Sequence, residues 1–274
     1  MNENVILPTL LVVVVVWEIL FPAVKGVRTF SPRRIGNLIF FPVNIGVSAV
    51  MKSSLVAFLP FIFFNFDRGL LSPLSAFPLA HSVAAFLLLD LSMYAQHRLL
   101  HTGRFFWGLH ALHHSDSAVD FTTYFRHHPL ETVISGVMTF TIAALLGVTP
   151  AVFAGYLLVN NAMQLFQHGN VQLPQRFRWV ERFFVTPAFH AQHHSIDRSV
   201  SDTNFSTVFT VWDRIFGTYR SVENQPKQFG IREFESPYDQ SIGTMMAMPG
   251  LVYMGSKRFI TPDSFAQEGR DPIV

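Results

Sequence analysis

The sequence has 274 residues, of which 50% are hydrophobic and only 14% charged, and its mean hydropathy is +0.31. A soluble domain usually carries about 25% charged residues, so this composition indicates a membrane protein. The net charge of +2 is too small, and the basic residues are too scattered, for a nucleic-acid partner. The chain has no cysteine, which excludes disulfides and thiolate ligands, so any metal must be bound through nitrogen and oxygen.

Five apolar stretches are predicted to lie in the membrane as helices. The first has twenty residues, which make a helix of about 30 Å and match one bilayer core. Basic residues follow this stretch and none precedes it, so we expect a retained anchor instead of a cleaved signal peptide. The last two have sixteen residues each, about 24 Å as helices, and form either two short crossings or a hairpin that enters the membrane part-way. The stretches lie near residues 5–24, 36–64, 74–94, 132–147 and 151–166.

Basic residues beside these stretches predict the topology. The run Lys25–Arg34 follows the first stretch, and Arg176, Arg178 and Arg182 follow the last one. Positively charged loops stay in the cytoplasm, so both segments favour the cytoplasmic side. We therefore expect an integral membrane protein, in a bacterial inner membrane, whose histidine-rich site lies at the cytoplasmic face.

The predicted fold class is all-α. We expect an integral membrane helical bundle with about four to five membrane-embedded helices and a cytosolic, helical, histidine-rich cap. No internal repeat or low-complexity linker interrupts the sequence, so residues 1–274 are expected to form a single domain. Residues beyond about 235 are rich in Gly, Pro and Met without a clear period, and we expect them to form a peripheral tail.

Three short clusters contain eight of the twelve histidines. Positions i, i+3 and i+4 share one face of an α-helix, so each cluster points its imidazoles the same way and can chelate a metal ion. A single histidine, such as His81 in an apolar stretch, is more often a core residue than a metal ligand. For the clusters, however, metal-binding spacing would have to arise by chance three times. The clusters are His97 and His101; His110, His113 and His114; and His190, His193 and His194.

The composition of these clusters indicates the kind of metal chemistry. Eight imidazoles exceed what one ion of four to six ligands can use, so two metals are implied. A hydrolytic zinc pair usually includes bridging carboxylates, and no Asp or Glu lies inside the clusters. Ligation by nitrogen alone therefore favours iron and oxygen chemistry. A membrane zinc-dependent hydrolase and a non-enzymatic metal-binding membrane protein remain the alternatives.

The clusters belong to a larger set of motifs that resembles the fatty acid hydroxylase / sterol desaturase superfamily. The further motifs are Arg126-x-His128-Pro129-x-Glu131, His168-Gly169-Asn170 and the segment 212–219, WDRIFGTY. The resemblance covers about residues 90–219, the expected catalytic region. It implies a membrane-embedded non-haem di-iron oxygenase, with two iron ions that zinc could replace in a purified sample. Such an enzyme uses O2 and two electrons to hydroxylate or desaturate a lipid.

The resemblance also carries roles to particular residues. It assigns metal binding to the eight clustered histidines and to His168, whereas His128 either ligates or supports the site and His127 is not a ligand. Metal-bound imidazoles usually donate their second N–H to a carboxylate or carbonyl. Asp90 precedes His97 by two helical turns and is a candidate for this supporting role, although a helix cap or salt bridge would explain such acids equally well. The expected supporting residues are Asp90, Glu131, Asn170 and Asp213.

The expected partners follow from the same reading. The sequence contains no haem-attachment motif and no cysteine set for an iron–sulfur cluster, so a separate donor must supply electrons, either a ferredoxin, a cytochrome or a reductase. The substrate is expected to be a lipid from the bilayer, in a channel lined by some of the aromatic residues near the clusters. The motifs describe the metal site and select neither the lipid nor the carbon.

Overall fold

The computed structural model of the protein describes residues 3–27, 31–62, 69–222, 226, 228–232 and 241–254. These residues form helices and loops, and the only β pairing among them is three isolated bridges. The predicted all-α class is therefore confirmed.

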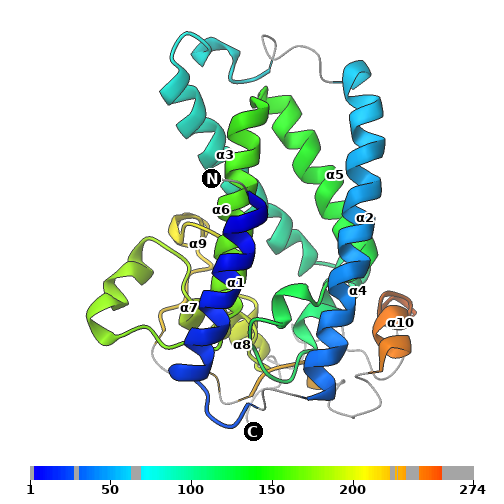
Figure 1. The fold of residues 1–274 in the computed structure, drawn as a ribbon, viewed down its shortest axis with the longest axis vertical. Coiled ribbons are helices and arrows are strands. Elements are labelled where there is room, and N and C mark those ends of the chain that lie inside the picture. The colour runs from blue at the N-terminus through cyan, green and yellow to red at the C-terminus, as the bar shows by residue number, and fades with distance from the viewer. Residues whose placement is uncertain are drawn as a thin grey trace, which may run out of the picture.

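Five long helices form the body of the molecule and run side by side (Figure 1). Helix α2 packs against α5, helix α3 against α5 and α6, and helix α1 against α6. Each predicted apolar stretch corresponds to one of them, with boundaries shifted by a few residues. The helices are α1 (Glu3–Leu20), α2 (Pro32–Ile62), α3 (Pro78–Leu100), α5 (Pro129–Leu146) and α6 (Pro150–His168).

Three segments within these helices are long and apolar enough to cross a membrane: Pro32–Met51, Pro78–Leu100 and Pro129–Leu146. The apolar part of α1, Val5–Leu20, is shorter. Helix α6 has the length but carries four amide side chains in its second half, which lower its hydropathy. The structure thus supports an integral membrane bundle, in which α1 and α6 are less typical spans than the other three.

The turn between α5 and α6 lies at the end of the bundle away from the histidine clusters. Gly147 ends α5 with a positive φ of 72°, and the Thr149 side chain caps α6. A Cβ on Gly69 would lie 2.3 Å from the Gly147 Cα, so glycine allows the preceding loop to approach this turn. His81 contacts the Gly147 carbonyl through Nε2 at 3.2 Å, which agrees with its interpretation as a core residue.

Short helices gather at the opposite end of the bundle and form the histidine-rich cap (Figure 1). Helix α4 follows α3 directly, and α7 packs against the end of α6. A 3-10 segment, η4 (Gln175–Arg182), connects α6 to α7. The cap helices are α4 (Arg104–His114), α7 (Pro187–His193), α8 (Arg198–Ser201), α9 (Val211–Ile215) and α10 (Ile242–Tyr253).

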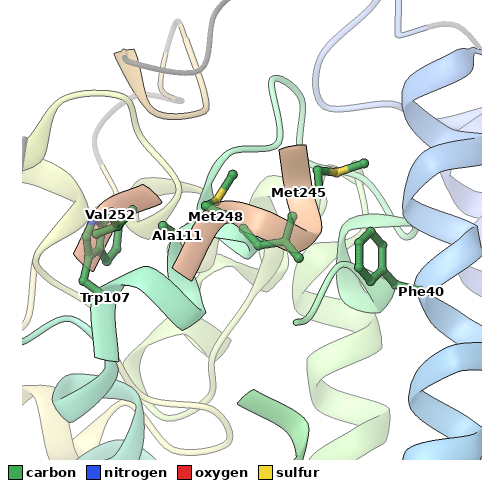
Figure 2. Close-up of a cluster of buried hydrophobic side chains, with 7 residues drawn as sticks. Phe40, Trp107, Ala111, Met245, Met248 and Val252 are labelled. Atoms are coloured by element: carbon green, nitrogen blue, oxygen red, sulfur yellow. The ribbon is translucent and has the colours of Figure 1, made fainter. Parts of the chain in front are cut away.

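The expectation of a peripheral tail after residue 235 is wrong for α10. Figure 2 shows Met245, Met248 and Val252 of this helix among Trp107 of α4 and Phe40 of α2. All five side chains are buried. Methionine fills irregular gaps without needing a regular period, which explains why the sequence pattern did not reveal this contact.

A buried charge network connects the first two helices to the cap. Arg33 pairs with Asp116 and Asp120, and Arg34 pairs with Asp120 and with Glu18, whose carboxylate lies 2.9 Å away. The prediction of a basic loop over 25–34 is thus wrong for its last two arginines, because they begin α2 and their charges are neutralised. The Lys52 side chain, in the second predicted stretch, lies outside the described part of the structure.

Candidate metal centre

The structure brings nine of the ten predicted metal-binding histidines into two adjacent groups. In each group, one ring nitrogen per residue lies within 4.8 Å of the others. All nine side chains are buried. The five-histidine group contains His97, His101, His110, His114 and His193; the four-histidine group contains His113, His168, His190 and His194.

Each H-x-x-H-H run divides its histidines between the two groups. In α4, His110 and His114 join the five-histidine group, and His113 joins the other. In the run at α7 the division is reversed, because His190 and His194 join the four-histidine group and His193 joins the five. The two runs therefore link the groups into one centre.

The distances between ring nitrogens match those of ligands around a common ion. Nε2 of His97 lies 3.1 Å from Nε2 of His110, and Nε2 of His168 lies 3.0 Å from those of His113 and His190. Nitrogens bound at about 2.1 Å and at right angles to each other would be about 3.0 Å apart. The spacing thus fits six-coordinate geometry in both groups.

The hydrogen bonds of the opposite ring nitrogens strengthen this fit. His97 donates from Nδ1 to the Phe205 carbonyl at 2.8 Å, and His110 donates from Nδ1 to Glu131 at 2.8 Å. In the neutral tautomers that make these bonds, both Nε2 atoms carry lone pairs and face each other. Two lone pairs at this distance repel unless a cation lies between them, so the donor set suits a metal ion.

Other histidines are oriented in the same way. His168 donates from Nδ1 to the Gln164 carbonyl, and His193 donates from Nδ1 to the Thr203 carbonyl. His101 donates from Nδ1 to Asp202 at 3.1 Å. Asp202 was not predicted as a partner, because it lies outside the clusters, eight residues after the last one. These bonds leave the Nε2 atoms available as ligands.

Burial favours the neutral form of several of the grouped histidines. It lowers the pKa of His193 to about 3, and neighbouring histidines lower it further. Burial also lowers the pKa values of His101, His113, His114 and His190 well below the ordinary range. Neutral imidazole is the form that binds a metal, so these side chains need not lose a proton at neutral pH.

The predicted supporting residues act in different ways. Glu131 accepts from His110, as expected, and from His127 at 3.0 Å. The expectation that Asp90 would lie behind His97 is wrong. Its carboxylate accepts instead from the Phe209 backbone N–H and from Trp212 Nε1, so it holds the loop that follows α8.

Asp213 supports the loop that follows α8, as Asp90 does, whereas Asn170 supports the segment that follows α1. Asp213 accepts from the backbone N–H groups of Phe205 and Ser206, and so fixes the carbonyl to which His97 donates. Asn170 pairs with the Val24 backbone through both ends of its amide and ties the segment after α1 to the end of α6. Within the described part of the chain, neither side chain forms a hydrogen bond with a histidine of the two groups.

His128 lies outside both groups, in contrast to the possibility that it ligates a metal. Its Nδ1 accepts from the Leu130 N–H as the N-cap of α5, and its Nε2 donates to the Met246 carbonyl at 3.2 Å. Both ring nitrogens are therefore occupied. The neighbouring His127 lies closer to the centre and stacks on His113 with ring centroids 4.4 Å apart.

A cavity of about 580 Å³ lies among helices α2, α3, α5 and α6 and reaches both histidine groups. His97 and His110 of one group, and His113, His168 and His190 of the other, form part of its wall. Tyr124 and Phe125, which are near the histidine clusters in the sequence, line this cavity, in agreement with the expected aromatic lining. Phe41, Phe140 and Phe153 also line it, although no sequence motif distinguishes them.

The fold and the site together define a helical membrane protein with a histidine-rich candidate metal centre. The model of the fatty acid hydroxylase family matches residues 82–218, a segment that includes all nine grouped histidines. The chain belongs to this family, which confirms the resemblance inferred from its motifs.

The chain is similar to several lipid monooxygenases and hydroxylases. It is 30% identical over 148 residues to the human alkylglycerol monooxygenase, which covers 54% of this chain and 32% of that protein. It is 30% identical over 145 residues to the ornithine lipid hydroxylase of Rhizobium tropici, covering 53% and 43%. A putative methylsterol monooxygenase of Dictyostelium discoideum is 31% identical over 156 residues, with 54% of each chain covered. The chain thus spans about a third to a half of these relatives, and no solved structure matches it.

Proposed function

We propose that this protein is a membrane-bound non-haem di-iron oxygenase that hydroxylates or desaturates a lipid, using O2 and electrons from a separate donor. One observation carries the proposal: two adjacent groups of imidazoles open onto a single cavity within a membrane helix bundle. The names of the relatives support oxygenation of lipids, because they are monooxygenases and hydroxylases.

The donor set favours iron over a hydrolytic metal pair. The five-histidine group would hold one ion and the four-histidine group a second one, and a six-coordinate metal would leave room for O2 at either group. Glu131 forms a smaller third group with His110 and His127, but no carboxylate belongs to the two larger groups. Bound iron would supply the activation of O2 that is needed to attack an unactivated C–H bond. Zinc could occupy the same nitrogens in a purified sample but would not supply this redox chemistry.

The protein's own contribution would be orientation and the exclusion of water. Backbone carbonyls and Glu131 fix the ring orientations through Nδ1, and burial favours the neutral form of several of the rings. The cavity wall combines the histidines with apolar side chains such as Phe140 and Leu157, so a lipid carbon can approach the centre from the bilayer. Asp90 and Asp213 would act as positioning residues, through the loop that they hold.

We further propose that the metal centre lies at the cytoplasmic face. Arg98, Arg104 and the arginines of η4 are exposed at the cap end, whereas residues 145–151 contain no Lys or Arg and the sequence between α2 and α3 contains one arginine, Arg68, next to Asp67. This asymmetry follows the positive-inside rule even without Arg33 and Arg34. It fits a bacterial inner membrane, with a soluble ferredoxin, cytochrome or reductase as the electron donor. We also propose that residues 1–274 form one domain, in which residues 90–219 are the catalytic region.

The test is oxygen transfer from 18O2. Full-length protein in nanodiscs, loaded with iron and given a reducing system and a lipid extract, should yield a lipid that gains one 18O atom or loses two hydrogens. The variant His193→Ala, prepared in the same way, should lose this product. Full turnover of a lipid under anaerobic conditions with zinc alone would overturn the proposal in favour of a hydrolase.

A further inference from the structure

The cavity beside the histidine groups changes in polarity along its length. Helix α5 starts at the cap, so Glu131 lies near the histidines and Phe140 lies about 13 Å further along the helix. Helix α6 returns to the cap, so Phe153 lies about 22 Å before His168 and Gln167 lies next to it. The wall near the histidines therefore includes Glu131 and Gln167, and the wall toward the α5–α6 turn includes Phe140 and Phe153.

Two amide oxygens of α6 in the wall of this cavity accept no hydrogen bond: Oδ1 of Asn160 and Oε1 of Gln167. Their side chains are buried, with exposed fractions of 4% and 2%. Oε2 of Glu131, in the same wall, has no partner either. Buried polar atoms in proteins are nearly always hydrogen-bonded, so three acceptors without donors around one cavity need an explanation.

Nδ1 of His113 and Nδ1 of His190 in the same wall also lack a partner, but two other amide side chains of this wall do not share this property. Oδ1 of Asn161 accepts from the Tyr124 hydroxyl at 3.1 Å, and its Nδ2 donates to the Leu157 carbonyl at 2.8 Å. Nε2 of Gln96 donates to Thr139. These amides complete bonds within the protein, so the unpaired acceptors are a particular feature of the wall and not a general one.

The two unpaired amides lie on one face of α6. Asn160 and Gln167 are seven residues apart, which is two helical turns. Side chains on a helix lean toward its N-terminus, so the longer glutamine side chain extends toward the asparagine. The two positions are about 10 Å apart along the helix axis, so a headgroup that carries two hydroxyl donors can reach both oxygens where a single hydroxyl cannot.

We propose that Asn160 and Gln167 bind the hydroxyl-bearing headgroup of an amphipathic lipid and so determine which carbon reacts. The inference rests on the oxygenase function proposed above and names the substrate class for the same site. The hydrocarbon chain lies along Phe140 and Phe153, toward the α5–α6 turn. The carbon that reaches the histidine groups is then one beside the headgroup, and neither a mid-chain carbon nor the terminal methyl.

The decisive measurement is binding without turnover. Iron-loaded, full-length protein in nanodiscs is titrated under anaerobic conditions with 1-O-hexadecylglycerol, which has two hydroxyl donors, and with its di-O-methyl ether, which has none. Leaving buried acceptors unpaired is costly, so the wild-type protein should bind the diol about 10- to 100-fold more tightly. Equal binding of the two lipids would overturn the inference without requiring any variant.

Variants then connect the preference to the two amides. Asn160→Leu with Gln167→Met keeps the side-chain volumes and removes the acceptors, so the preference should fall to within about twofold. The matched control is Asn161→Leu, which changes the same residue type in the same wall and should retain the preference, because that amide is already paired. If the double variant keeps the full preference, the discrimination is steric and the inference fails.

The position of the product separates this inference from the proposed function. With 18O2 and reductant, the diol should gain oxygen at a carbon beside its headgroup. Equal oxidation of both lipids would reject the headgroup site while supporting the oxygenase. Selective binding of the diol without oxidation of any lipid would reject the oxygenase and leave the headgroup site in place.

Discussion

Replacing Glu131 by glutamine is expected to weaken metal binding by the five-histidine group more than by the four-histidine group. The carboxylate accepts hydrogen bonds from His110 and His127, and only 5% of its side chain is exposed. Loss of such a partner behind a metal-bound imidazole typically reduces metal affinity by about 10- to 100-fold, or about 1.4–2.8 kcal/mol. The variant keeps its size, so the effect arises from the lost charge.

Asp202→Asn provides the comparison. Asp202 accepts from His101 of the same group, but 43% of its side chain is exposed to solvent. Water screens such a pair, so its loss should reduce affinity by less than about fivefold. Both substitutions therefore act on one group, from a buried and from an exposed position.

The assay is competition with chelators of increasing strength, followed by measurement of iron per chain. The Glu131→Gln protein should lose one ion at a chelator strength that leaves both ions in the wild-type and Asp202→Asn proteins, and should retain the second ion. Simultaneous loss of both ions, or an equal effect of the two variants, would refute the division into two separately supported groups.

Three further outcomes are expected. Met248→Ala should destabilise the protein by about 2–5 kcal/mol, because this side chain is fully buried between α10 and α4, whereas the exposed Met246→Ala should have little effect; chemical unfolding of the two variants distinguishes them. Metal-free protein should lose stability as the pH falls from about 6.5 toward 3, because burial lowers the pKa of His193 to about 3 and only the unfolded chain takes up the proton in this range; thermal unfolding that is constant or improves over this interval would contradict it. Arg126→Lys should destabilise the protein by about 3–5 kcal/mol, because Arg126 is fully buried and its guanidinium bonds to Leu112, Asn37 and Ser115 in a fork that an ammonium cannot reproduce; a melting temperature equal to that of the wild type would show that the fork is dispensable.

The histidine spacing predicted much of the candidate site because it acts within one or two helical turns. His110, His113 and His114 share a helix face whatever the rest of the fold does, and the same holds for His97 and His101. The division of each run between two groups was not predictable. It depends on how α4 and α7 face each other, and nothing in either run specifies this.

Features that join distant segments were also missed. Asp90 has the right helical spacing to support His97, but the loop after α8 takes its carboxylate instead. Asp202 was not selected, because its contact with His101 spans 101 residues of the chain. Helix α10 was read as a tail because its methionines show no period, although they complete a core beside Trp107.

The buried charges at the start of α2 have a consequence for how the chain enters the membrane. Arg33 and Arg34 are synthesised more than eighty residues before Asp116 and Asp120, their main partners. A nascent α2 therefore presents two guanidinium groups that these acids have not yet neutralised, and in the topology proposed above that end stays on the side of synthesis. In this topology the same two arginines would first orient the insertion of a helix and afterwards stabilise the finished bundle.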